Sequence, residues 1–130
     1  EPTEKHQFSM YINGLFYELI LRKHAYRFSN PLDALDPQIL YKTVLEPVFG
    51  VTDLRHDSRI HYGCAPMNAL KIKKLVDKGV YDIGFDMTPV SVDELKAISD
   101  AGLKMPPKST FIEPKLPSGL TIYDFQNPDL

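Results

Sequence analysis

The sequence predicts one α+β domain over residues 1–130, built as a mixed β-sheet with helices packed on it. Two strand-like runs joined by Asn13-Gly14 predict an N-terminal β-hairpin. A βαβαβ-like middle and a C-terminal β-hairpin follow in the pattern of apolar residues. The length suits one hydrophobic core, because a chain of this size buries roughly two thirds of the surface that it exposes when unfolded.

The N-terminal hairpin is predicted over residues 6–22. Asn13-Gly14 is the dipeptide that best tolerates the positive φ angles of a two-residue type I′ turn. Apolar residues alternate with polar ones along the first strand, at Phe8, Met10 and Ile12. This alternation is typical of a sheet with one face on the core, whereas residues 23–35 lose the pattern and predict a loop.

The first predicted helix begins at Asp36 and Pro37, because a carboxylate at the N-cap accepts free backbone N–H groups and proline loses nothing in the first turn. Asp33 fits the same capping role. Leu40, Tyr41, Val44 and Leu45 form one apolar stripe. The helix is expected to end at Glu46-Pro47, since the residue before a proline avoids the α region.

Two more helices alternate with predicted strands. A strand over residues 59–63 precedes a helix from Pro66 to a stop at Gly79, and a strand over residues 80–87 comes next. The third helix starts with the capping box Ser91 and Glu94 and ends at Gly102. The C-terminal hairpin is expected from strands over residues 110–113 and 120–125.

Composition narrows the class of function. Fifteen Lys and Arg against 17 Asp and Glu give a net charge of −2, which disfavours binding to nucleic acid. Cys64 is the only cysteine, so no internal disulfide can form. The longest apolar runs are far shorter than the ~20 residues that cross a bilayer, and no targeting sequence opens the chain. A cytoplasmic protein without membrane contact is therefore expected, and the absence of an initial methionine suggests a piece of a longer chain.

The candidate ligand-binding residues lie in the proline-rich stretch MPPKSTFIEPKLPSGL, and they are Lys108, Ser109, Thr110 and Lys115. The stretch lacks the glycines of a P-loop, yet lysines and hydroxyls held by stiff prolines suit contact with an anion. The alternative is an ordinary loop that fixes the last hairpin.

Other candidates have plainer explanations. Cys64 is predicted to follow a strand and precede a helix, a position where the thiolate form is favoured, but a small buried thiol explains it too. His61 lies three residues away and would point to the opposite face of a continuing strand, so a Cys-His pair is not supported. His56 with Asp53 and Asp57 suits either a divalent ion or a solvated loop. Asp82 and Asp86 share one face of a strand, as expected for its polar side. The sequence predicts no metal site and points to no particular cofactor.

Three segments of the chain resemble a known family. In sequence order they are FSMYINGLFYELIL, PLDALDPQILYKTVLEPVFGV and LVDKGVYDIGFDMTPVSVDELKAISDAGLKMPPKSTFIEPKLPSGL. Nearly end to end, the chain resembles the C-terminal portion of the "domain of unknown function 1015" proteins, which also carry a ParB-like chromosome-partitioning label. The most specific part of the resemblance is the block MPPKSTFIEPK. The residues that match the family pattern directly there are Met105, Pro106, Pro107, Lys108, Ser109, Thr110, Pro114 and Lys115. The chain departs from the family at Asp86 and Met87, where an apolar residue is usual.

The resemblance implies a longer protein whose N-terminal portion would be a partner of this chain. It also implies a role near phosphoserine or a related metabolite. Two functional hypotheses follow. In the first, a cytosolic enzyme binds or acts on a small phosphorylated or amino-acid metabolite. In the second, the chain is a structural or interaction domain that meets the rest of the protein or a second copy of itself.

Overall fold

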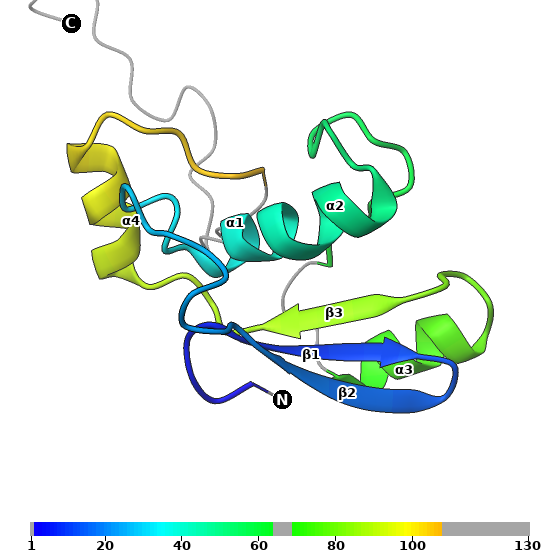
Figure 1. Ribbon diagram of the computed structural model, residues 1–130. Helices are drawn as coiled ribbons and strands as arrows, with labels where there is room; N and C mark the ends of the chain where they lie inside the picture. Colours follow the sequence, from blue (N-terminus) through cyan, green and yellow to red (C-terminus); the bar gives the residue numbers. More distant parts are fainter. Residues whose placement is uncertain (1, 64–68, 108–130) are drawn as a thin grey trace, which may run out of the picture.

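A computed structural model describes residues 2–63 and 69–107 of the protein. The described part has a three-stranded sheet with helices around it (Figure 1). Its elements in chain order are β1 (Gln7–Ile12), β2 (Leu15–Ile20), α1 (Asp36–Leu40), η1 (Tyr41–Leu45), α2 (Glu46–Phe49), α3 (Ala69–Asp77), β3 (Gly84–Met87) and α4 (Val92–Asp100). The predicted C-terminal hairpin, Cys64 and Pro66 lie outside the described residues.

The sheet has the strand order β2-β1-β3, and both pairings are antiparallel. The N-terminal hairpin is confirmed: Ile12 pairs with Leu15 across Asn13 and Gly14, which have φ angles of 51° and 80°. The α+β class is confirmed as well. A mixed sheet was expected, and the strands that the structure describes are all antiparallel; residues 59–63 do not add the strand predicted there.

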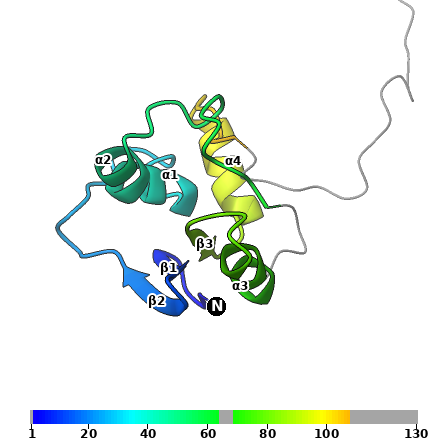
Figure 2. The ribbon, with the colours of Figure 1, turned by 90° about the vertical axis from the view of Figure 1, so that its right-hand side faces the viewer.

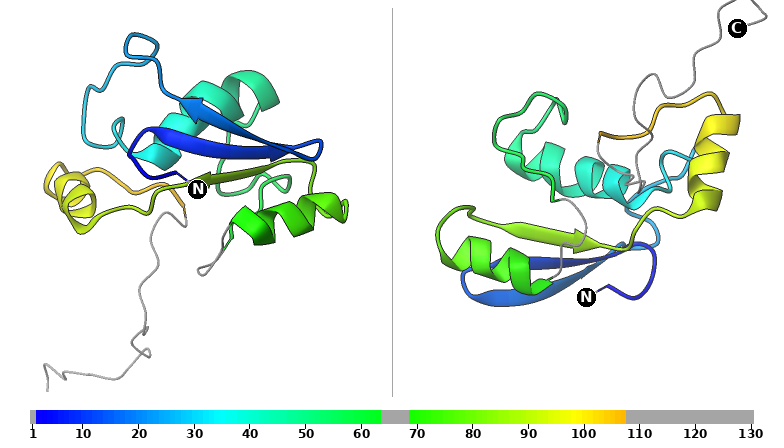
Figure 3. Two further views of the ribbon diagram at one scale, coloured as in Figure 1. Left: turned by 90° about the horizontal axis from the view of Figure 1, so that it is seen from below. Right: turned by 180° about the vertical axis from the view of Figure 1, so that it is seen from behind.

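Helices cover both faces of the sheet (Figures 2 and 3). Phe8 of β1 packs with Ile39 and Leu40 of α1 on one face. Tyr11 lies three residues later, so it points to the other face, where its hydroxyl donates to Asp77 of α3. Both faces of β1 are therefore buried, which places this strand at the centre of the domain.

The helix after Asp36 differs from its prediction at both ends. Leu35 is the N-cap and makes no side-chain capping bond, while Asp36 is buried and bonds elsewhere. Pro47 does not end the helix, because the backbone widens into the π-helix η1, in which the Glu46 N–H reaches the Tyr41 carbonyl five residues back. A wider turn accommodates a proline that lacks an N–H. The chain leaves α2 at Gly50, whose φ angle is 67°.

Residues 59–63 form an irregular segment, so the predicted strand there is wrong. Arg59 bonds to the Phe49 carbonyl and to Asp57, and the Tyr62 hydroxyl donates to the Leu54 carbonyl. These contacts tie the segment back to the preceding loop instead of to the sheet. Strand β3 is also shorter than expected and begins at Gly84.

The third predicted helix is confirmed as α4, and its capping box is complete. The Glu94 N–H donates to Ser91 Oγ, and the Ser91 N–H donates to Glu94 Oε2. No helix within residues 2–63 and 69–107 has the length and apolar character needed to cross a bilayer.

Gly84 of β3 lies directly against Ile72 of α3, and this contact yields a prediction. A Cβ at Gly84 would lie 2.1 Å from Ile72 Cγ2. We expect Gly84→Ala to lower the free energy of unfolding by about 1–3 kcal/mol through overpacking, as measured by urea denaturation. Adding Ile72→Ala, which removes the clashing methyl, should recover part of that loss. An unchanged unfolding midpoint in Gly84→Ala would contradict this packing.

Candidate functional site

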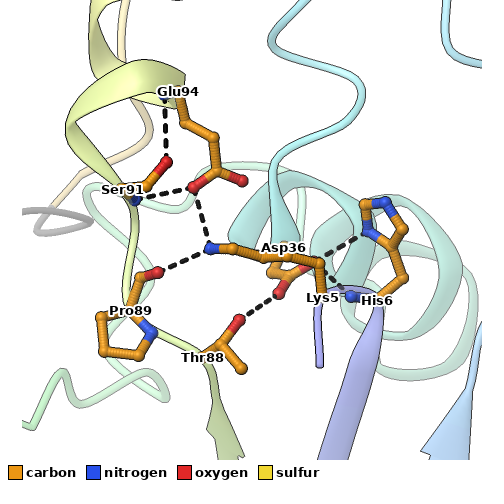
Figure 4. Close-up of polar contacts among 7 residues, drawn as sticks. All are labelled: Lys5, His6, Asp36, Thr88, Pro89, Ser91 and Glu94. Carbon is orange, nitrogen blue, oxygen red and sulfur yellow. Dashed lines mark hydrogen bonds and ion pairs between the residues drawn. The ribbon is translucent and has the colours of Figure 1, made fainter. Parts of the chain in front are cut away.

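A buried carboxylate joins three segments that are distant in sequence. The Asp36 side chain is 1% exposed and accepts hydrogen bonds from the His6 backbone N–H at 2.9 Å and from Thr88 Oγ1 at 2.9 Å. His6 Nδ1 lies 3.0 Å from the same oxygen as the His6 N–H (Figure 4). Asp36 thus connects the start of β1, the start of α1 and the end of β3.

The same region continues through Lys5. Its ammonium lies 2.6 Å from the Pro89 carbonyl and 2.8 Å from Glu94 Oε2, so it ties the N-terminal segment to the start of α4 (Figure 4). Partial burial raises the pKa of Glu94, but hydrogen bonds from Lys5 and the Ser91 N–H outweigh it and leave the pKa below its usual value. We call this group the polar junction, and its residues are Lys5, His6, Asp36, Thr88, Pro89, Ser91 and Glu94.

The polar junction is best explained as a structural element. His6 has a φ angle of 68°, a conformation that is uncommon outside glycine and is held here by two contacts to Asp36. Within the part of the chain that the structure describes, no buried side-chain N or O atom lacks a hydrogen-bond partner. The groups of the junction are therefore engaged with one another, and a ligand is not needed to satisfy them.

A pocket is the better candidate for binding. It has a volume of about 270 Å³ and lies between α1, the loop after α2 and the segment after α4. In Figure 1 the orange segment after α4 runs back toward α1 and the green loop. Its polar lining residues are Gln38, Tyr41, Thr52, Asp53, Arg55 and Lys104. Its apolar lining residues are Leu32, Leu54, Met105, Pro106 and Pro107. We call it the loop pocket.

Local hydrogen bonds shape the loop that forms one wall of the loop pocket. Asp53 Oδ1 accepts from the N–H groups of Arg55 and His56, and Asp53 Oδ2 lies 2.9 Å from His56 Nδ1. The hydrogen bond from the His56 ring, with the backbone N–H of Arg55 second, lowers the pKa of Asp53 below its usual range. Asp53 therefore remains ionised at neutral pH and fixes the turn.

The tyrosine in the loop pocket is also fixed. The Tyr41 hydroxyl lies 2.9 Å from Glu46 Oε2 and 3.2 Å from the Thr52 carbonyl. Its hydrogen bond to Glu46 raises the pKa of Tyr41, so the phenol stays neutral at physiological pH. By contrast, no hydrogen bond or ion pair within residues 2–63 and 69–107 holds the side-chain nitrogens of Arg55 and Lys104. These two cations are the available charged donors of the pocket.

The predicted ligand residues Lys108, Ser109, Thr110 and Lys115 lie outside the described residues, but the start of their motif does not. Met105, Pro106 and Pro107 line the loop pocket, directly before Lys108 in the sequence. Arg55 and Lys104 were not singled out from the sequence, since no local pattern links them. The proximity of Lys104 to the MPPK block was the one available signal.

The remaining sequence candidates have structural surroundings. His61 packs beside Tyr81, with ring centroids 5.4 Å apart. Asp53 and His56 do approach each other, yet no group of three metal-ligating side chains is found among the described residues. Asp33 does not cap a helix; it accepts from the Ser29 N–H and so closes the loop before α1. Asp86 accepts from the N–H of Met87 within β3.

Comparison with known proteins gives no relative: no protein-family model, curated protein or solved structure matches this chain significantly.

Asp36 provides a prediction about stability. Asp36→Ala would leave the donors of His6 and Thr88 without their acceptor, and we expect it to lower the free energy of unfolding by about 3 kcal/mol or more. Thr88→Val removes one donor and should cost about 1 kcal/mol, whereas Thr88→Ser keeps the donor and serves as its control. Urea unfolding measures all three. Equal midpoints for Asp36→Ala and the unmodified protein would refute the anchoring role.

The loop after α2 provides a prediction about pH. The side-chain hydrogen bond from Arg59 lowers the pKa of Asp57 to about 2, from an ordinary value of 3.8. The depressed pKa means that this ion pair contributes stability at pH above about 4, and that the contribution disappears as the pH falls through about 2. Carboxyl ¹³C shifts should therefore titrate near pH 2 for Asp57.

In Arg59→Gln the pKa of Asp57 should rise from about 2 toward its ordinary value of 3.8, because the guanidinium is gone; the backbone N–H at position 59 still donates to Asp57 and keeps the rise incomplete. Arg55→Gln changes the same loop without touching Asp57 and should leave that midpoint in place. A midpoint that stays near 2 in Arg59→Gln would show that another group holds the carboxylate.

Proposed function

We propose that this chain is a cytosolic binding domain for a small anionic metabolite, either a phosphorylated compound or an amino acid, and that the loop pocket is its site. One observation carries the proposal: Arg55 and Lys104 come from distant parts of the sequence and line the same cavity. Both are cations at neutral pH, and a guanidinium beside an ammonium is a common arrangement for binding carboxylate or phosphate oxygens.

The size and lining of the pocket support a small ligand. A volume of about 270 Å³ falls just below the ~300–1,000 Å³ of sites for drug-sized molecules. The Gln38 amide supplies further polar contacts, and Leu54 and Met105 supply an apolar wall. A metabolite with a short carbon chain and one or two acid groups fits this combination.

The proline-rich block supports the same site. Pro106 and Pro107 line the pocket, and proline restricts the backbone before any ligand arrives. In this proposal Lys108, Ser109, Thr110 and Lys115 extend the anion site beyond the described residues. The resemblance to the "domain of unknown function 1015" proteins favours this extension, since the block is its most specific part. The N-terminal portion implied by that resemblance would complete any catalytic site.

An interaction domain is the second candidate, and the outer edge of β2 favours it. No described strand pairs with that edge. Leu15, Phe16, Tyr17 and Ile20 on this strand are 58%, 49%, 44% and 63% exposed. Exposed apolar side chains on a free sheet edge suit association with the rest of a longer protein or with a second copy of the chain.

Charge-removing variants test the binding proposal. Arg55→Gln and Lys104→Gln should each weaken binding of inorganic phosphate and O-phospho-L-serine about tenfold, because a charge-assisted hydrogen bond is lost. Calorimetry on the full chain measures the affinity, and thermal melting should stay unchanged. Lys96→Gln, on an exposed position of α4 away from the pocket, is the matched control.

The binding proposal is wrong if neither anion shifts the amide resonances of residues 52–56 and 104–107 in the unmodified protein. Variants that lose binding together with their folded state would point to a structural role for these residues and favour the interaction domain.

A further inference from the structure

The loop pocket carries charges of both signs. Asp53 lines the same pocket as Arg55 and Lys104, so the lining includes one acidic and two basic residues. Besides fixing its turn, this carboxylate would repel a ligand that carries only negative charge, such as inorganic phosphate. The charge arrangement therefore restricts the class of ligand further than the two cations alone.

Asp53 has capacity for one more donor. A carboxylate offers about four acceptor positions. Three are used, by the Arg55 N–H, the His56 N–H and the His56 ring, and two of these contacts fall on Oδ1. Oδ2 therefore keeps a free position. Its side chain is 55% exposed, so an ammonium group can reach it.

The balance of charge identifies the ligand class. With one carboxylate and two cations, the lining side chains carry one net positive charge. The matching ligand has one positive group and two acid groups. Phosphate or a simple dicarboxylate lacks the positive group, and a neutral amino acid lacks the second acid.

We infer that the loop pocket binds an acidic α-amino acid, with its ammonium group at Asp53 and its two acid groups at Arg55 and Lys104. This inference rests on the proposed function and makes it more specific. The ligand class is an L-amino acid whose side chain ends in a carboxylate or a phosphate. Gln38 and Thr52, which also line the cavity, can donate to the remaining acid oxygens.

The test compares ligands that differ only at the ammonium group. Calorimetric titration of the full chain uses L-glutamate against glutarate, and O-phospho-L-serine against 3-phosphoglycerate. We expect each amino acid to bind about tenfold or more tighter than its partner, because glutarate offers Asp53 no donor and 3-phosphoglycerate offers only a neutral hydroxyl in place of the ammonium. Amide resonances of residues 52–56 and 104–107 should shift with the amino acids.

Asp53→Asn completes the test. Asparagine keeps an Oδ1 acceptor for the N–H groups of Arg55 and His56, so the turn is retained, and the amide spectrum of the variant checks this. In the variant, each amino acid should lose its tenfold advantage, while glutarate and 3-phosphoglycerate bind as well as before or better.

The outcomes separate the two proposals. Equal affinity for amino acids and their ammonium-free partners in the unmodified protein would overturn the acidic amino-acid assignment but leave anion binding in place. An advantage that persists in Asp53→Asn would also overturn it. If neither the four compounds nor inorganic phosphate binds, both this inference and the proposed function are wrong.

Discussion

The burial of the Asp36 carboxylate is the constraint that organises this domain. A buried carboxylate needs hydrogen-bond donors, because its transfer out of water is otherwise costly. Asp36 obtains them from His6, 30 residues before it, and from Thr88, 52 residues after it. The Asp36 carboxylate can accept these hydrogen bonds only when the start of β1, α1 and the end of β3 have come together. One side chain thereby fixes the relative positions of three segments.

The loop pocket depends on this assembly. Gln38 and Tyr41 follow Asp36 within the same continuous helix, so the position of Asp36 sets the position of one pocket wall. Thr88 leads through Pro89 into α4, and the segment that contains Lys104 leaves the end of that helix. Lys5 adds a second link at the start of α4 through Glu94. The polar junction thus helps to place both walls of the loop pocket, although none of its residues lines the pocket.

The features that sequence predicts well here are those set by neighbouring residues. Asn13-Gly14 and the Ser91–Glu94 capping box need only a few residues to form, and both were predictable. Asp36 was predicted to be an N-cap, because capping is the local role open to an aspartate before a helix. In the structure its carboxylate instead accepts hydrogen bonds from residues distant in sequence. The helix continues through Pro47 because of a π-turn between Tyr41 and Glu46, which the proline rule does not anticipate. The hydrogen bond from Arg59 to the Phe49 carbonyl joins residues ten positions apart. Arg55 and Lys104 are farther apart still in sequence, so no local pattern could place them in one pocket.

Two kinds of contact hold the backbone around the loop pocket, and they affect the conformational entropy that a ligand would remove on binding. Asp53, Tyr41 and Arg59 fix their loop through hydrogen bonds, whereas Pro106 and Pro107 restrict the opposite wall through their rings. If the proposed ligand binds here, these contacts and rings hold the backbone of both walls in advance, so the entropy lost on binding would fall mainly on the long side chains of Arg55 and Lys104. The placement of charge would then be the main feature by which the site discriminates between ligands.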